Sequence, residues 1–113
     1  PKALAIGPKI QSTTERAYKA GVNIAFGSDA GVFPHGNNAK EFIYMNEAGI
    51  PIIECLQAAT IVNAKILSME TEIGQLEKDF IADIVATKSN PEDDISTLEN
   101  VIFVMKKGVI YKN

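Results

Sequence analysis

The chain has 113 residues, the length of about one domain, and its hydrophobic fraction of 46% and charged fraction of 22% are typical of globular proteins. A net charge of −3 offers no basic face for nucleic acid or for anionic lipid. The longest apolar runs, such as 81–86, are interrupted by Asp83 and are too short for a membrane span. We therefore expect neither nucleic acid nor a membrane as a partner.

The N-terminal residues predict a connector followed by a helix. Residues 2–8 end in Gly-Pro, which is typical of a connecting segment. Ser12 and Glu15 have the spacing of a capping box, which predicts a helix from about Thr13 to Ala20. Gly21 supplies the left-handed residue that commonly ends a helix. The first residue is not Met, and we expect the chain to be a piece of a larger gene product.

Residues 22–36 bring a carboxylate and the only histidine of the chain close together in sequence. The apolar run Asn23–Phe26 predicts a strand buried on both faces of a parallel sheet, and a turn with Asp29 follows it. Functional groups gather at the carboxyl ends of such strands, where Asp29 could bind a divalent cation or transfer a proton. Its alternative role is to accept bonds from the amides of its own turn. His35 could bind a substrate or lie on the surface, and one Asp with one His cannot hold zinc.

A second helix is predicted directly after this loop. Asn38 and Glu41 repeat the capping spacing, and the apolar residues that follow extend the pattern to Ala48. Gly49 is expected to end this helix.

Two further helices are predicted in the middle of the chain. Residues 51–59 begin with a proline, which suits the first turn of a helix. Thr60 and Asn63 predict a break and a new cap before a short helix over 64–68. Cys55 lies in an apolar helical stripe, so we expect a buried, unreactive thiol, and no other cysteine is present to pair with it.

From Ile73 onward the pattern changes to short strands in a mostly antiparallel arrangement. The predicted strands are 73–74, 82–87, 101–105 and 109–111, with a turn at Lys107 and Gly108. Residues 90–94 form an acidic loop that we expect to be solvated.

Several groups of residues, taken in order, resemble the amidohydrolase superfamily of metal-dependent hydrolases built on a TIM barrel. The run 24–31, Ile-Ala-Phe-Gly-Ser-Asp-Ala-Gly, resembles the motif of the eighth barrel strand. Residues 34–41, with Pro-His-Gly, Asn-Ala and a glutamate, resemble the branch that contains imidazolonepropionase-like enzymes and Xaa-Pro dipeptidases. Residues 58–67 resemble the helices that follow that strand. Residues 73–85 and 101–111 resemble the return into the family's small β-domain and its closing strands.

The resemblance implies an α/β fold, namely the C-terminal fragment of a TIM-barrel hydrolase. Residues 1–69 would form the end of the (β/α)8 barrel, including its eighth strand, and residues 70–113 would form C-terminal strands of the composite β-sandwich domain. A complete barrel takes about 250 residues, so the remainder of the parent polypeptide is an expected partner of this chain. A small-molecule or dipeptide-like substrate is the other expected partner. Whether the protein forms a homo-oligomer is not decided by the sequence.

The same resemblance implies a metal-dependent reaction. The family's aspartate after the eighth strand is a metal ligand and the general acid/base for the hydrolytic water, and this position is Asp29. His35 would lie near the substrate. The implied cofactor is a divalent metal, expected to be zinc as one or two ions, with its other ligands outside this chain. The implied activity is hydrolysis of C–N bonds in amides, dipeptides or cyclic amides, and we expect the isolated chain to be inactive.

Some positions depart from the family pattern. Ser28 stands where threonine is more common and keeps the hydroxyl, while Asp79 occupies a turn that usually has glycine and tolerates left-handed geometry. Asp83 is expected to be structural. We expect Ile24 and Phe26 to expose apolar surface.

Two other functions are considered beside hydrolysis. The first is a non-enzymatic interaction or structural module that retained the scaffold without a metal site. The second is a doubly wound domain that uses 27–31 to approach a phosphate.

Overall fold

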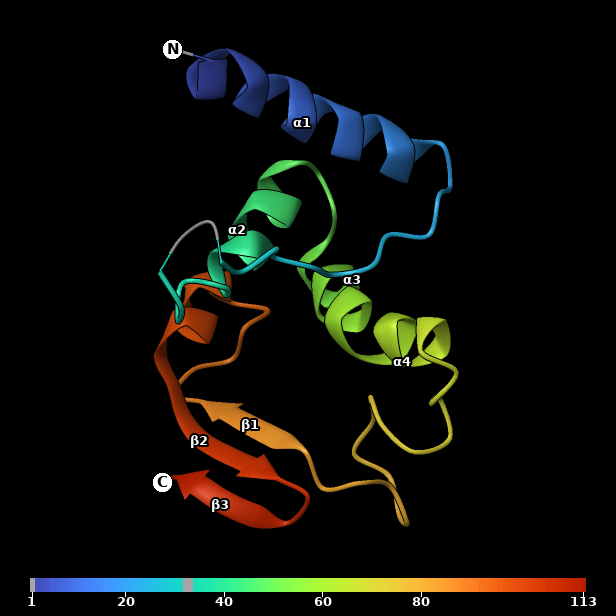
Figure 1. Cartoon of the computed structure of the whole chain (residues 1–113), viewed down its shortest axis with the longest axis vertical. Helices are drawn as coiled ribbons and strands as arrows, with labels where there is room; N and C mark the ends of the chain where they lie inside the picture. Colours follow the sequence, from blue (N-terminus) through green and yellow to red (C-terminus); the bar gives the residue numbers. More distant parts are fainter. Residues whose placement is uncertain (1, 32–33) are drawn as a thin grey trace.

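The computed structural model describes residues 2–31 and 34–113, with the backbone alone for residues 2–6. The helical part comprises α1 (Lys2–Lys19), α2 (Lys40–Glu47), α3 (Ile52–Gln57), the π-helical turn η1 (Ala58–Val62) and α4 (Asn63–Ile66). The sheet part comprises β1 (Ile84–Thr87), the 3₁₀ helix η2 (Ile95–Asn100), β2 (Val101–Lys106) and β3 (Val109–Lys112). Helix α1 crosses one end of the molecule and the sheet lies at the other (Figure 1).

Helix α1 is longer than the sequence predicts. The predicted connector over residues 2–8 is wrong, because the helix begins at Lys2 and continues through Pro8 at the expense of one backbone hydrogen bond. The predicted capping box is also wrong. The hydroxyl of Ser12 donates to the carbonyl of Lys9 in the preceding turn, at 3.0 Å, and Glu15 pairs with Lys19. A serine within a helix can satisfy its hydroxyl in this way, so its presence does not require a helix start.

The predicted ends of α1 and α2 are confirmed. Gly21 and Gly49 have φ of 77° and 90°, a left-handed conformation that favours glycine. After α2, Gly49 donates to the carbonyl of Asn46 and Ile50 donates to that of Met45, which is the pair of bonds that closes a Schellman motif. The predicted cap at Asn38 is wrong, because α2 has no side-chain cap and begins at Lys40.

Helices α3, η1 and α4 form one continuous helical segment over residues 52–66. The predicted break at Thr60 is therefore wrong, as is the cap at Asn63. In place of a break, the helix has the π-helical turn η1 at this point. The Thr60 hydroxyl donates to the Leu56 carbonyl at 2.7 Å. Such turns insert one residue into a helix and change the direction in which the following side chains point.

The core lies between the helices and a crossing extended segment. Its buried members are Met45, Ile50, Cys55 and Ala58. Half-buried apolar side chains pack around them from α1, the extended segment, α2 and η2, and these are Tyr18, Ile24, Phe26, Phe42 and Ile95. Ile24 and Phe26 are half-buried against this core, so the surface that they expose is smaller than the sequence leads us to expect.

The buried thiol of Cys55 is predicted to be unreactive in the folded protein. Cys55 is fully buried, and this burial, together with the charge of Glu54, raises its pKa from 9.0 to about 11. Because the thiolate is the nucleophile, iodoacetamide at neutral pH should label Cys55 only after unfolding, as read by mass spectrometry of its peptide. The folded state holds the proton more tightly, so stability should fall as the pH rises from about 9 to 11. Rapid labelling of the folded protein would contradict this prediction.

The C-terminal part is a three-stranded sheet in the order β1-β2-β3, and the antiparallel arrangement that the sequence predicts is confirmed. Strand β1 begins at Ile84, two residues later than predicted, and residues 73–74 form bends and no strand. Asp83 accepts a hydrogen bond from the backbone N–H of Lys107 at 2.7 Å and so fixes the β2–β3 turn. This bond supports the structural role expected for Asp83. Asp79 has a φ of 69°, which confirms left-handed geometry at the position where the family usually has glycine.

The acidic loop before η2 is a turn, as expected. Within it Asp94 has a specific structural role, because its carboxylate accepts bonds from the backbone N–H and the hydroxyl of Ser96 at 3.0 and 2.7 Å and so caps η2. These bonds hold the pKa of Asp94 below its usual range.

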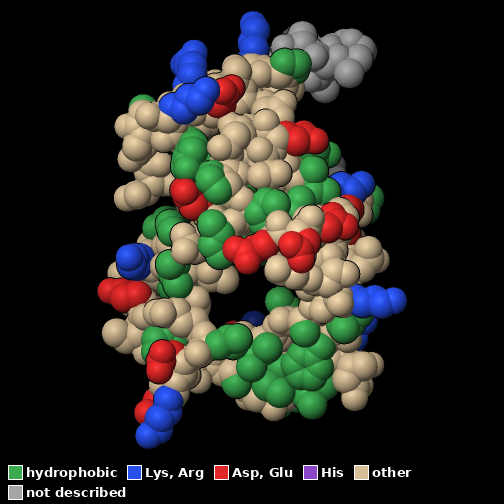
Figure 2. Space-filling model, turned by 180° about the vertical axis from the view of Figure 1, so that it is seen from behind, with side chains coloured by type: hydrophobic (Ala, Val, Ile, Leu, Met, Phe, Trp, Pro, Cys, Tyr) green, Lys and Arg blue, Asp and Glu red, His purple; other side chains and the backbone are tan. Residues whose placement is uncertain are grey.

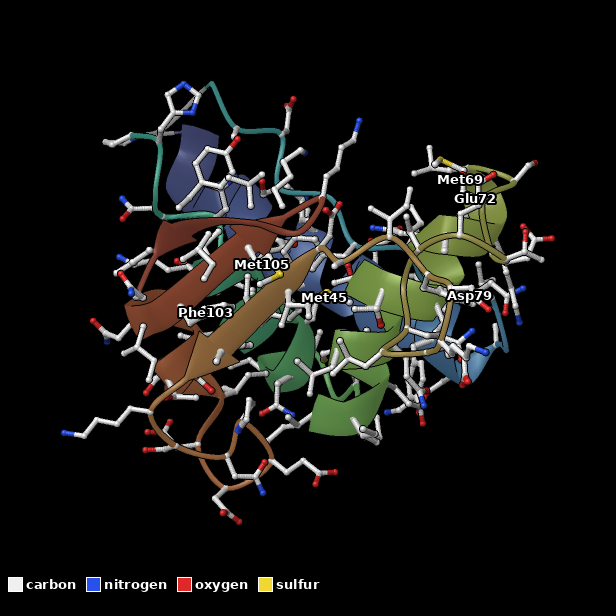
Figure 3. The ribbon with its side chains drawn as sticks, turned by 90° about the horizontal axis from the view of Figure 1, so that it is seen from below. Met45, Met69, Glu72, Asp79, Phe103 and Met105 are labelled. Atoms are coloured by element: carbon white, nitrogen blue, oxygen red, sulfur yellow. The ribbon has the colours of Figure 1, made fainter. Side chains whose placement is uncertain are left out.

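The helical and sheet parts meet through η2, where Ile95 packs against the core. Elsewhere they separate, and Figure 2 shows an opening between them with a patch of hydrophobic side chains at the sheet end. The large apolar residues exposed on the sheet are Val85, Ile102, Val109, Ile110 and Tyr111. Figure 3 shows Phe103 and Met105 on β2, with Met69, Glu72 and Asp79 to one side on the α4–β1 connection. Among residues 2–31 and 34–113, no helix combines the length and apolar character that crossing a bilayer requires.

Candidate functional site

The segment 22–28, which leads to Asp29, crosses the core (Figure 1) but forms no strand with any residue that the structure describes. The predicted strand Asn23–Phe26 is thus wrong for this chain, since a strand is defined by a hydrogen-bonded neighbour. Ile24 and Phe26 face the core, while Asn23 and Ala25 are exposed. The alternation of the pattern is therefore that of a strand with one covered face, and the prediction of burial on both faces does not hold.

Two hydrogen bonds anchor this segment to the helical segment beneath it. The N–H of Phe26 donates to the carbonyl of Ala58 at 3.3 Å, and the side-chain amide of Asn63 donates to the carbonyl of Phe26 at 2.9 Å. The ring of Phe26 also stacks on that of Phe42, with centroids 4.3 Å apart. These contacts come from both ends of the π-helical turn and from α2, so they fix the position of the chain three residues before Asp29.

Asp29 is exposed and adopts a left-handed backbone with φ of 47°. This conformation is uncommon outside glycine, and aspartate is among the residues that adopt it most readily. Its carboxylate forms no hydrogen bond with the residues that the structure describes, including the amides of Ala30 and Gly31 that the alternative role requires. The carboxylate is therefore available for a ligand.

His35 lies on an exposed turn that leads to α2. It makes no described side-chain contact that would give it a structural role, and the residues that separate it from Asp29 include positions 32 and 33, outside the described residues. Asp29 and His35 stay the predicted site residues, as metal ligand with acid/base role and as substrate contact respectively.

One side chain links the hydroxyl of Ser28, the residue before Asp29, to the backbone of Gly36, the residue after His35. The amide nitrogen of Asn38 donates to the hydroxyl of Ser28 at 3.0 Å, and its carbonyl oxygen accepts from the N–H of Gly36 at 3.2 Å. Ser28 and Asn38 are both half-buried. The bridge thus begins at the residue before Asp29 and ends at the residue after His35.

This part of the chain has a hollow of about 290 Å³ lined in part by Asn37 and Asn38, and a second hollow that lies away from Asp29. A groove of about 350 Å³ runs between α1 and α2, with Ile10, Tyr44 and Met45 among its lining residues. Glu41 also lines it, and burial raises the pKa of this carboxyl group. Neither Asp29 nor His35 contributes to this groove, so it is a separate feature of the surface.

The described residues do not by themselves form a metal centre. No group of three or more His, Cys, Asp or Glu side chains in 2–31 and 34–113 is placed to hold an ion. Asp29 can provide one carboxylate ligand, which suits a divalent cation, but a protein zinc site takes three or four ligands. The other ligands of any such site must come from outside the described residues.

The deciding observation is a match to a family model. Residues 5–111 match the model described as Amidohydrolase family. The chain belongs to the amidohydrolase family. The resemblance derived from the motifs is confirmed, as is the fold class of an α/β portion of a TIM-barrel hydrolase with a small sheet. The phosphate-binding doubly wound domain is excluded by this membership and by the antiparallel sheet.

Several amidohydrolase relatives are similar over most of this chain. A crystal structure of a Xaa-Pro dipeptidase with methionine in its active site superposes with a TM-score of 0.94 at 50% identity, covering 100% of this chain and 28% of that one. A prolidase complexed with N-methylphosphonate-L-proline gives 0.80 at 31% identity, covering 91% and 26%. Ochratoxinase from Aspergillus niger is 34% identical over 101 residues, which are 85% of this chain and 21% of the relative. The chain thus spans about a quarter of these amidohydrolases.

The contacts that Asn38 and Asn63 make were not predicted from the sequence. Asn38 and Asn63 both stand at helix-cap spacing, yet their side chains bond to Ser28 and to the Phe26 carbonyl, 10 and 37 residues away. Cap spacing is a local signal, whereas these partners are brought together only by the tertiary fold. The asparagine in the resembled motif 34–41 was the available signal for Asn38, although it gave no partner.

Proposed function

We propose that this chain is the portion of a longer, metal-dependent amidohydrolase that carries the catalytic carboxylate Asp29. The proposed reaction of the whole enzyme is hydrolysis of the C–N bond in a Xaa-Pro dipeptide. In the same proposal, residues 1–69 belong to the barrel and residues 70–113 to the small β-domain. The observation that carries it is the similarity to a Xaa-Pro dipeptidase over the full chain, with a TM-score of 0.94 at 50% identity.

The unpaired backbone groups of the segment 22–28 support the proposal that the remaining polypeptide packs beside it. Within the described residues, Phe26 is the one member of 23–28 whose N–H donates to a backbone carbonyl. An extended segment with unpaired N–H and C=O groups is a template for neighbouring strands. In the proposed enzyme the adjoining barrel strands pair with it on both sides and the exposed Asn23 and Ala25 face the barrel interior.

The exposure of Asp29 and its lack of hydrogen bonds with the described residues support the chemistry proposed for it. A divalent metal, when bound, lowers the pKa of water toward neutrality and polarises the scissile carbonyl. Asp29 would be one of its ligands, would accept a proton from the attacking water, and would donate it to the departing amine. His35 would contact the substrate from its exposed turn. We propose zinc as the metal, since a carboxylate such as that of Asp29 is among the ligands that zinc takes in proteins.

A dipeptide assay of the full-length protein tests this function. We expect Met-Pro to be hydrolysed in the presence of Zn²⁺, because the similar dipeptidase was solved with methionine in its active site. Met-Ala is the matched control for the proline position. Chelation followed by dialysis should lower kcat/KM at least about tenfold, and added Zn²⁺ should restore it. Failure to hydrolyse any amide, dipeptide or cyclic amide with metal bound would contradict the proposal and favour a non-enzymatic interaction module.

A further inference from the structure

The bridge formed by Asn38 has a fixed polarity. A backbone N–H can only donate, so the bond from Gly36 requires the carbonyl oxygen of the Asn38 side chain at that end. The amide nitrogen then faces Ser28, whose hydroxyl oxygen accepts. The side chain cannot be reversed without placing its NH₂ group against the N–H of Gly36. One residue therefore holds the side-chain hydroxyl of Ser28 and the backbone N–H of Gly36 in a defined relation.

The bridge formed by Asn38 is important because few other described contacts fix the position of Asp29. Its carboxylate is exposed and makes no hydrogen bond with the described residues, and its left-handed backbone is an uncommon conformation for a residue with a side chain. Anchoring at Phe26 fixes the chain three residues earlier. Between that anchor and Asp29, the hydrogen bond of the Ser28 hydroxyl to Asn38 is the remaining described side-chain contact.

We propose that Asn38 is a positioning residue, which orients the Asp29 carboxylate for proton transfer by holding Ser28 on one side and Gly36 on the other. This inference rests on the proposed hydrolytic function and deepens it. Asn38 itself does not touch the reacting atoms. Its effect reaches the reaction through the backbone, where a displacement of about 1 Å can cost about 100-fold in rate.

The test is a set of variants of the full-length, metal-loaded protein assayed with Met-Pro. Asn38→Ala and Ser28→Ala each break the same bond, so each should lower kcat by about 10- to 100-fold with KM changed less than about threefold. Because both remove one interaction, the double variant should be no slower than the slower single one. Ser28→Thr keeps the hydroxyl and should retain wild-type kcat.

The control is Asn37→Ala, which removes an exposed asparagine next to Asn38 whose side chain forms no described hydrogen bond. It should leave kcat unchanged. If Asn38 is merely structural, the loss of activity in Asn38→Ala will follow the loss of folded protein, and kcat per folded molecule will stay at the wild-type value. That outcome, or a fully additive double variant, overturns the inference. Absence of hydrolysis by the wild type would overturn the proposed function first, and this inference with it.

Discussion

Replacing Asp29 by asparagine in the full-length protein is expected to lower kcat by at least about 1,000-fold, with the fold intact. General acid–base catalysis contributes about 100- to 10,000-fold, and asparagine can neither accept the proton of the attacking water nor carry the charge of a metal ligand. Because the side chain is exposed and forms no described hydrogen bond, the free energy of unfolding should change by no more than about 0.5 kcal/mol.

The measurement is steady-state kinetics with Met-Pro, combined with thermal unfolding and metal analysis of the variant. Asp83→Asn is the matched control, since it makes the same chemical change at the residue before β1 and keeps an oxygen that can accept from Lys107 in the β2–β3 turn. Its kcat should equal that of the wild type. Near-wild-type kcat for Asp29→Asn with metal bound would refute the role assigned to Asp29.

Replacing Gly74 by alanine is expected to destabilise the protein by about 3 to 5 kcal/mol. Gly74 has a φ of +89°, and a Cβ there would lie 2.9 Å from both the Cβ of Ala64 and the carbonyl oxygen of Thr60. Neither neighbour can move away easily, because Ala64 is buried and the Thr60 carbonyl belongs to the π-helical turn. The substitution therefore combines backbone strain with overpacking.

Urea unfolding of the full-length protein, followed by circular dichroism, measures this effect. Gly49→Ala is the control, because Gly49 has a similar φ of +90° but no atom within 4 Å of the added Cβ. It should cost about 1 to 2 kcal/mol from strain alone. Equal destabilisation by the two variants would show that the close approach to η1 contributes nothing.

The helix ends and the C-terminal strands could be predicted because their signals are local. Gly21 and Gly49 end helices through their own backbone conformation, and the turn at Lys107 and Gly108 joins two strands that are adjacent in sequence. Asp79 was likewise predicted from the geometry that one residue can adopt. The family motifs added the fold class, which no local signal contains.

The errors arose where a residue type has more than one way to satisfy its hydrogen bonds. Ser12 bonds within a helix, while Asn38 and Asn63 bond to distant parts of the chain, although each stands at cap spacing. The predicted strand Asn23–Phe26 failed for a different reason, since pairing depends on neighbours that the described residues do not provide. The candidate site was predicted as Asp29 and His35, but the bridge of Asn38 between their neighbours Ser28 and Gly36 was not.

The most direct test of the central claim is an anomalous difference map from a crystal of the full-length protein grown with Zn²⁺ and measured at the zinc edge. The proposed function predicts an anomalous peak within coordinating distance of the Asp29 carboxylate, with the remaining ligands supplied by residues outside this chain. A zinc peak coordinated elsewhere, with Asp29 directed into solvent, would contradict it.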